Sequence, residues 1–246
     1  MSLNVLSLFS GVGGLELGLE RAGMTTVGQV ELDDYCRSVL AHHWPEVPRH
    51  DDVRTAPEWW LGEQRPRVDV VCGGFPCQPF SIAGNQLGTA DERWGWPWMA
   101  DVVRAVRPRY VVVENVAALL RDADAFGWIL GDLHRLGFDA EWSIVSACSL
   151  GATHVRKRLF LVAHPKSEGL QGLHAASSGI DLQRAAEGIR RQWESEPGVA
   201  RVAHGVPVRL VRDPIQAYGN AVVPQVAELI GRLIVSHHQQ SLEAAA

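Results

Sequence analysis

Short apolar runs rich in β-branched residues alternate along the chain with segments of helical periodicity. The runs at 5–9, 27–30, 68–71 and 110–113 predict buried strands, because short apolar runs bounded by turn residues are typical of parallel sheets. A helical stripe follows the first run at Leu15, Leu19 and Ala22. A second stripe follows Pro224, and it comprises Val226, Leu229, Ile230, Leu233 and Ile234. This alternation predicts one doubly wound α/β domain, in which the C-terminal helix packs back on the N-terminal sheet and places Asn220 beside Gly11.

The first strand runs into a glycine-rich turn. Gly11, Gly13 and Gly14 follow it and precede the first helical stripe. Glycines let a backbone turn sharply and approach a ligand closely, and a helix start offers N–H groups to a carboxylate or phosphate. The dinucleotide fingerprint would need glycine where Glu16 stands. We therefore expect a nucleotide-binding turn of another kind.

Acidic residues end the next two units. Glu31 follows the run at 27–30, where a strand-end carboxylate can accept both hydroxyls of a ribose. Asp52 precedes Val53 in a third unit and could accept from an adenine amino group. Either carboxylate could instead cap the following helix.

Cys77 lies in a Gly- and Pro-rich loop after the run at 68–71. Active-site loops leave parallel strands at their carboxyl ends, and Pro76 would stiffen the approach to the thiol. Cys77 is therefore a candidate nucleophile; the alternative is a small buried apolar side chain.

Two further strands end in charged residues. Glu114 and Asn115 follow the run at 110–113, where partial desolvation would raise the pKa of the carboxyl and let it share a proton. Arg156 and Arg158 alternate along a later strand and would point to one face, which suits an anion or a polarised carbonyl. A solvated glutamate and a solvated arginine face are the alternatives.

Taken in this order, FSGVGG, Glu31, Asp52, FPCQ, ENV, the arginine pair and GNAVVP resemble the cytosine carbon-5 DNA methyltransferase family. The match spans nearly the whole chain. The resemblance implies a Rossmann-like methyltransferase sheet completed by the C-terminal helix. It implies transfer of a methyl group from S-adenosylmethionine to cytosine, giving 5-methylcytosine and S-adenosylhomocysteine. No metal is implied, and the sequence offers no convincing ligand cluster.

The resemblance also assigns cofactor contacts. Phe9 would stack on the adenine, Glu31 would hold the ribose and Asp52 the adenine amino group. Asn220 and Ala221 would complete the pocket around the methionine carboxylate. The full expected set is Phe9, Ser10, Gly11, Gly13, Gly14, Glu31, Leu32, Asp52, Val53, Gly74, Pro76, Asn220 and Ala221.

Catalysis would be covalent and would act on a flipped base, since carbon 5 inside a stacked duplex is out of reach. The Cys77 thiolate would add to carbon 6, Glu114 would hydrogen-bond ring nitrogen 3 and the exocyclic amine, and the arginine pair would orient the base. The expected catalytic set is Cys77, Glu114, Arg156, Arg158, Pro76, Gln78 and Asn115.

The loop at 79–98 would act as a clamp, with Ser81 on the neighbouring phosphate and Arg93 stabilising the closed form. Two stretches depart from the family pattern. Trp94, Gly95, Trp96 and Pro97 follow the loop arginine and could change its closure, and Thr153-His154 stand where relatives carry Pro-Gln.

We expect residues 1–164 and 214–240 to form the catalytic domain, 165–213 a small target-recognition region, and 241–246 a vector-derived tail. So short a recognition region predicts a short or degenerate target and a compact bacterial, phage or prophage enzyme. The net charge is −5, yet residues 151–213 hold 10 Lys and Arg against 6 Asp and Glu. That segment, with Arg184, Arg190, Arg191, Arg201, Arg209 and Arg212, could neutralise the phosphates of double-stranded DNA. An ordinary mixed surface is the alternative.

The four cysteines, with no secretory signal and no apolar run of transmembrane length, favour a reducing bacterial or phage-host cytosol. We expect a monomer without a membrane, and any cognate restriction endonuclease would be a separate protein. One rival is the branch of the family that methylates transfer RNA. Its Cys-Phe-Thr motif is missing, because residues 165–213 contain no cysteine. A non-catalytic DNA- or cofactor-binding relative is the other rival, and the intact Cys77, Glu114 and arginine pair argue against it.

Overall fold

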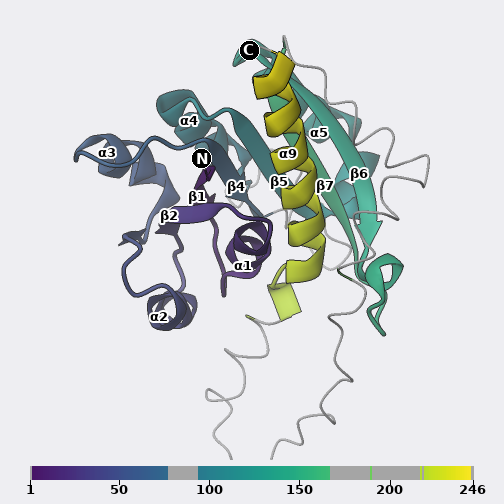
Figure 1. Ribbon diagram of the computed structural model, residues 1–246, viewed down its shortest axis with the longest axis horizontal. Helices are drawn as coiled ribbons and strands as arrows, with labels where there is room; N and C mark the ends of the chain where they lie inside the picture. Colours follow the sequence, from purple (N-terminus) through teal and green to yellow (C-terminus); the bar gives the residue numbers. More distant parts are fainter. Residues whose placement is uncertain (1, 77–93, 167–188, 190–216, 218, 245–246) are drawn as a thin grey trace, which may run out of the picture.

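The computed structural model describes residues 2–76, 94–166, 189, 217 and 219–244 of the 246 in the chain. Within them the strands form one seven-stranded sheet with the order β3-β2-β1-β4-β5-β7-β6 (Figure 1). The strands are β1 (Asn4–Leu8), β2 (Thr25–Val30), β3 (Arg49–His50), β4 (Val70–Gly73), β5 (Tyr110–Val116), β6 (Phe138–Ser146) and β7 (Lys157–Pro165). The helices are α1 (Gly14–Arg21), α2 (Asp34–His43), α3 (Ala56–Leu61), α4 (Trp96–Val106), α5 (Ala123–Arg135) and α9 (Pro224–Ala244). Short 3-10 turns occur at η1 (Val53–Thr55), η4 (Ala117–Arg121) and η5 (Ala147–Leu150).

Strands β1 to β5 are parallel, whereas β7 runs antiparallel to both β5 and β6. The sheet is therefore mixed, and the predicted α/β class is confirmed. The apolar runs form strands β1, β2, β4 and β5 as predicted. The edge strand β6 has no such run, because its side chains are only partly buried and polar residues interrupt it.

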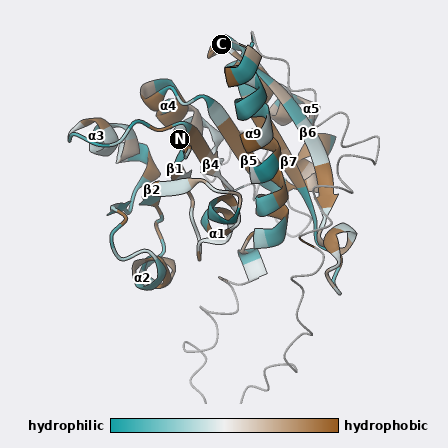
Figure 2. Ribbon diagram, viewed as in Figure 1, coloured by the Kyte–Doolittle hydropathy of each residue, from teal (hydrophilic) through white to brown (hydrophobic). Residues whose placement is uncertain are grey.

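Side chains of the central strands alternate between two apolar layers, and Figure 2 shows hydrophobic residues concentrated along these strands. On β5, Val111 and Val113 face the layer covered by α3, α4 and α5. Tyr110 and Val112 face the layer covered by α1 and α9. Both faces are covered, which is why the strands carry continuous apolar runs.

The C-terminal helix lies across the sheet beside α1 (Figure 1). Its predicted stripe is buried at Val226, Leu229, Ile230 and Ile234, and Leu233 is partly buried. Close approach depends on Gly18, since a Cβ atom there would lie 2.4 Å from both Ala227 Cβ and the Pro224 carbonyl oxygen. The predicted packing of this helix onto the N-terminal half is therefore confirmed. It runs through Ala244, so residues 241–244 of the expected tail are helical.

The end of the expected clamp is part of the core. Trp94 and Trp96 are buried, and both rings pack against Phe75. Trp96 Nε1 donates to Asp132 Oδ2 of α5 at 2.8 Å, and Pro97 occupies the first turn of α4. The prediction that a mobile loop extends to Trp98 was wrong, because these tryptophans fill the space between α4, α5 and the sheet. Loop residues 77–93 lie outside the described residues.

No helix within the described ranges is long and apolar enough to cross a membrane.

Candidate active site

A cavity of about 1140 Å³ opens at the carboxyl ends of the parallel strands. This is the edge where ligands bind in open α/β sheets, because loops diverge there and leave a crevice. Every predicted cofactor residue lines the cavity except Gly13 and Gly14, and so do Pro76, Glu114, Asn115 and Arg158 of the predicted catalytic set. Residues far apart in the sequence are thereby brought to one site. Gly11 and Asn220 both line it, as the expected position of the C-terminal helix requires.

The glycine-rich turn adopts a left-handed backbone. Its φ angles are +53° at Phe9, +56° at Gly11 and +88° at Gly13. The turn is fixed by hydrogen bonds from Ser10 N–H to the Val30 carbonyl at 3.1 Å and from Gly13 N–H to the Ser10 carbonyl at 3.0 Å. A Cβ atom at Gly14 would lie 2.3 Å from the Val222 carbonyl oxygen. Gly14 thus shapes the site from beneath by letting the segment before α9 close over the start of α1.

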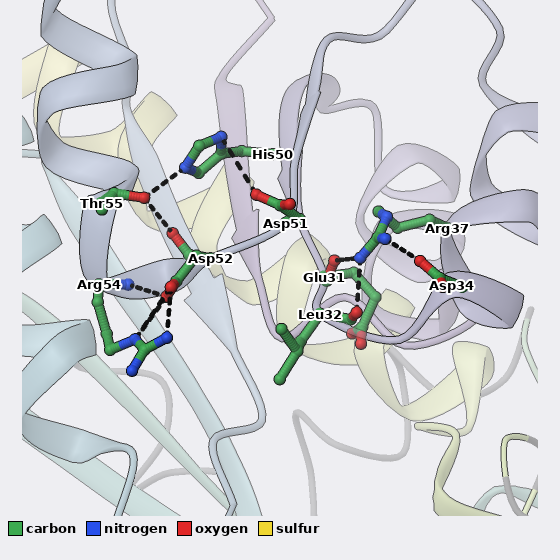
Figure 3. Close-up of polar contacts among 9 residues, drawn as sticks. All are labelled: Glu31, Leu32, Asp34, Arg37, His50, Asp51, Asp52, Arg54 and Thr55. Atoms are coloured by element: carbon green, nitrogen blue, oxygen red, sulfur yellow. Dashed lines mark hydrogen bonds and ion pairs between the residues drawn. The ribbon is translucent and has the colours of Figure 1, made fainter.

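The carboxylate of Glu31 is held at the cavity wall. It accepts the Gly11 N–H at 2.7 Å and the Asp33 N–H at 2.8 Å. Figure 3 shows Arg37 donating to the Glu31 backbone carbonyl. Asp33, rather than Glu31, caps α2 by accepting the Cys36 N–H. The helix-capping alternative is therefore not realised for Glu31. Its side chain instead links the glycine-rich turn to β2.

Asp52 has a different environment. It caps η1 by accepting the Arg54 N–H at 2.9 Å, and the Arg54 guanidinium binds both carboxylate oxygens (Figure 3). The hydrogen bonds from the Arg54 side chain lower the pKa of Asp52 to about 2. The capping alternative is realised here, and the carboxylate still lines the cavity.

Glu114 is buried at the end of β5 and forms an ion pair with Arg158 of β7. Arg158 Nε lies 3.2 Å from Glu114 Oε1. Burial raises the pKa of Glu114, while the positive charges of Arg158 and Arg156 oppose that shift. The site therefore holds a carboxyl group that keeps its proton to higher pH than a solvated glutamate would.

The two arginines have separate contacts. Arg156 lies one residue before β7, and its Nη1 donates to the Gly219 carbonyl at 2.8 Å. Burial lowers the pKa of Arg156, and Arg158 adds to this effect. Arg158 binds the site carboxylate, whereas Arg156 ties the start of β7 to the segment before α9. Arg156 precedes β7, so the two arginines do not both belong to that strand as expected. Both positive charges nevertheless lower the pKa of Glu114.

Asn115 connects β5 to the segment that precedes Cys77. Its Nδ2 donates to the Phe75 carbonyl at 3.1 Å, and its Oδ1 accepts the Val116 N–H at 2.8 Å. The first of these bonds holds Phe75 against β5, and the second fixes the Asn115 side chain. The described residues do not include Cys77, Gln78, Ser81 or Arg93. Of residues 167–213 they include only Ile189.

Cys36 and Cys72 differ from a reactive thiol. Burial raises the pKa of Cys36 to about 12 and that of Cys72 still further. Neither is a nucleophile at neutral pH. Among the described residues, no cluster of three or more His, Cys, Asp or Glu side chains could hold a metal ion.

Several cavity residues were missed from the sequence. Tyr35 and Cys36 reach it from α2 and Trp98 from α4, with Asp33, Asp34, Asp51 and Arg54 around them. Trp98 stands in an aromatic cluster, which is a signal of a site, but the Gly- and Pro-rich sequence around it predicts a loop. The helical turn that aims Trp98 at the cavity depends on the burial of its neighbours.

The fold and the cavity define the class of the protein. The S. pombe Dnmt2 methyltransferase shares this fold with a TM-score of 0.60 at 19% identity, over 81% of this chain and 58% of that one. The arrangement is a Rossmann-like methyltransferase fold with a mixed sheet.

The model of the C-5 cytosine-specific DNA methylase family matches residues 3–195. The chain belongs to that family. It is 33% identical over 160 residues to the type II methyltransferase M.NgoBI of Neisseria gonorrhoeae, covering 64% of this chain and 49% of that protein. It is 36% identical over 165 residues to the type II methyltransferase M.NaeI of Lentzea aerocolonigenes, covering 66% and 40%. The match thus spans about half the length of these curated relatives, or less.

Proposed function

We propose that this chain is a DNA (cytosine-5)-methyltransferase that uses S-adenosylmethionine. The observation that carries the proposal is one cavity lined both by the Glu114–Arg158 ion pair and by the glycine-rich turn, Glu31 and Asp52. The Glu114 carboxyl group, which could hydrogen-bond a nucleic-acid base, and the residues that could hold a nucleoside therefore line the same cavity. Family membership and the type II methyltransferase relatives support the same reaction.

The described residues fit the cofactor. The cavity has room for a nucleoside with an amino-acid tail, and Leu15 in the first turn of α1 lines it together with Asn220 and Ala221, so a carboxylate there would lie near the start of α1. Glu31 would hold the ribose hydroxyls, Asp52 and Phe9 the adenine, and Asn220 the methionine end. When bound, S-adenosylmethionine supplies an electrophilic methyl group.

The protein's own part in the reaction is covalent catalysis. The Cys77 thiolate would attack carbon 6 of a flipped cytosine, and the displaced electron pair would make carbon 5 nucleophilic. Glu114 in its acid form would donate to ring nitrogen 3, while Arg158 keeps the carboxyl oriented toward the base. After carbon 5 takes the methyl group, loss of its proton restores the ring double bond and expels Cys77.

Residues 165–213 would read the DNA target. They lie between the end of β7 and the segment that leads to α9, and residues 151–213 carry ten basic against six acidic side chains. The positive charge of this segment would bind phosphates, and only a few of its side chains would contact bases. A short or degenerate target follows from the size of this region. Any cognate endonuclease would be a separate protein.

The proposal is tested by base-resolution sequencing of DNA from a methylation-free bacterium that expresses the chain. Wild-type protein should produce 5-methylcytosine in one short motif, whereas Cys77→Ser and Glu114→Gln should not. Cys148→Ser is the matched control, because Cys148 is an exposed thiol that does not line the cavity. If the protein is folded and binds S-adenosylhomocysteine but the DNA contains no methylated cytosine, the proposal that DNA is the substrate is wrong. Transfer RNA would then be tested next.

A further inference from the structure

Glu16 is a fully buried acid that the proposed reaction does not use. It lies in the first turn of α1, directly beneath the glycine-rich turn, and does not line the cavity. Neither carboxylate oxygen completes a well-formed hydrogen bond with a described residue. An ionised carboxylate in such a place loses its hydration without gaining a cation, which is strongly unfavourable.

The groups around Glu16 favour its neutral form. Burial raises its pKa to about 7, and the charge of Glu20 on the same helix adds to that effect. The backbone N–H of Glu16 and the hydroxyls of Ser7 on β1 and Ser10 oppose it. Cys72 faces Glu16 from β4 and stays a thiol, because burial raises its own pKa.

The helix packed on α1 supplies no cation to Glu16. The buried acid of α9 is Glu228, which already binds Arg232 one turn later. The basic residue in the last turn of α1 is Arg21, which is exposed. Glu16 therefore titrates near neutral pH with no positive partner among the described residues.

Ser10 connects Glu16 to the cavity. Its hydroxyl donates to Ser7 Oγ at 3.1 Å, and its carbonyl accepts the Gly13 N–H that closes the turn. Ser10 also lines the cavity wall. A negative charge on Glu16 would pull on these hydroxyls and would repel an anion at the start of α1. Both effects oppose a ligand carboxylate at that place.

We propose that Glu16 is a positioning residue that makes cofactor binding depend on pH, because its ionised form would disturb the hydrogen bond between the Ser10 and Ser7 hydroxyls and would oppose the ligand carboxylate. The inference rests on the proposed function, since it takes S-adenosylmethionine and its product as ligands of the cavity. Glu16 would thereby control the affinity for the ligand without contacting it.

The test is calorimetric titration of S-adenosylhomocysteine into wild-type protein, Glu16→Gln and Glu20→Gln between about pH 6 and about pH 8.5, on either side of the shifted group. Wild-type affinity should fall by about threefold or more across this range. Glu16→Gln should bind at every pH with the affinity that the wild type shows at the lower end of the range. Glu20→Gln removes an equal charge from the same helix and should keep the pH dependence of the wild type, displaced to slightly lower pH because the Glu20 charge helps to raise the pKa of Glu16. The Glu20 side chain accepts from Trp44 Nε1, which a glutamine can also do.

A second measurement needs no variant. The ¹³C shift of the Glu16 carboxyl in wild-type protein should report a higher pKa with S-adenosylhomocysteine bound than without it, since linkage is reciprocal. The same pH dependence in Glu16→Gln as in wild type, or an unchanged pKa on binding, would overturn the inference alone. Wild-type protein that binds no S-adenosylhomocysteine at any pH would overturn the proposed function and this inference with it.

Discussion

Arg158 and Glu114 form their ion pair diagonally across two antiparallel strands. Arg158 of β7 stands opposite Val116 of β5, two residues beyond Glu114 and on the same face. Diagonal neighbours of an antiparallel pair lie within reach of long side chains. Because β7 runs antiparallel to β5, the Arg158 guanidinium reaches the carboxyl group of Glu114, which is buried near the end of β5.

Replacing Arg158 by alanine should slow methyl transfer by about 100-fold, the order expected for loss of one electrostatic contact in a site. Arg158 lowers the pKa of Glu114 against the effect of burial, so its removal should raise that pKa further. The limb of the rate profile that reports Glu114 should then move to higher pH. Single-turnover rates across pH would measure both effects.

Arg104→Ala is the control for this substitution, because Arg104 is an exposed residue of α4 paired with Asp101. It should retain the wild-type rate and profile. A wild-type profile in Arg158→Ala would contradict the role given to the ion pair.

Glu31→Ala should weaken S-adenosylhomocysteine binding by about tenfold or more, as loss of hydrogen bonds to a charged group does. Glu31 would hold the ribose and also accepts the Gly11 N–H, so its loss removes a ligand contact and loosens the turn. Calorimetry would measure the affinity. Glu63→Ala removes an exposed carboxylate outside the cavity and should change nothing. An unchanged affinity in Glu31→Ala would refute the ribose assignment.

Gly18→Ala should lower the free energy of unfolding by about 1–3 kcal/mol, because the added methyl group overpacks the contact between α1 and α9. Gly127→Ala is the matched helical control, since a Cβ atom there meets nothing within 4 Å. It should stabilise α5 by up to about 1 kcal/mol. Urea denaturation of both variants measures the difference. Equal stability of the two would mean that the helices can separate at no cost.

Stability should fall as pH rises from about 4.5 to about 7, through the ionisation of Glu16. The pKa of Glu16 is raised from 4.5 to about 7 in the folded state, so the unfolded chain releases its proton first. Between these pH values the folded state keeps a proton that the unfolded chain has released. The free energy of unfolding therefore falls by about 3 kcal/mol at most over this interval. Glu16→Gln should therefore be more stable than wild type above pH 7, in denaturant titrations at several pH values. A constant difference between the two proteins at every pH would contradict the shift.

Local patterns along the chain predicted one part of the fold. The apolar runs of β1, β2, β4 and β5, the glycine-rich turn and the stripe of α9 follow from periodicity and turn chemistry over a few residues. The order of motifs pointed to the family, since each motif is a short local signature.

The environments that side chains share depend on the folded chain. Trp96 lies in the core because α4 and α5 close around it, Arg54 takes the carboxylate of Asp52, and Glu16 loses its solvent beneath the turn. Burial and electrostatic interactions depend on neighbours that are distant in sequence, and no local pattern reports them. For that reason the titration of Glu16 and the partner of Glu114 became visible only in the folded chain.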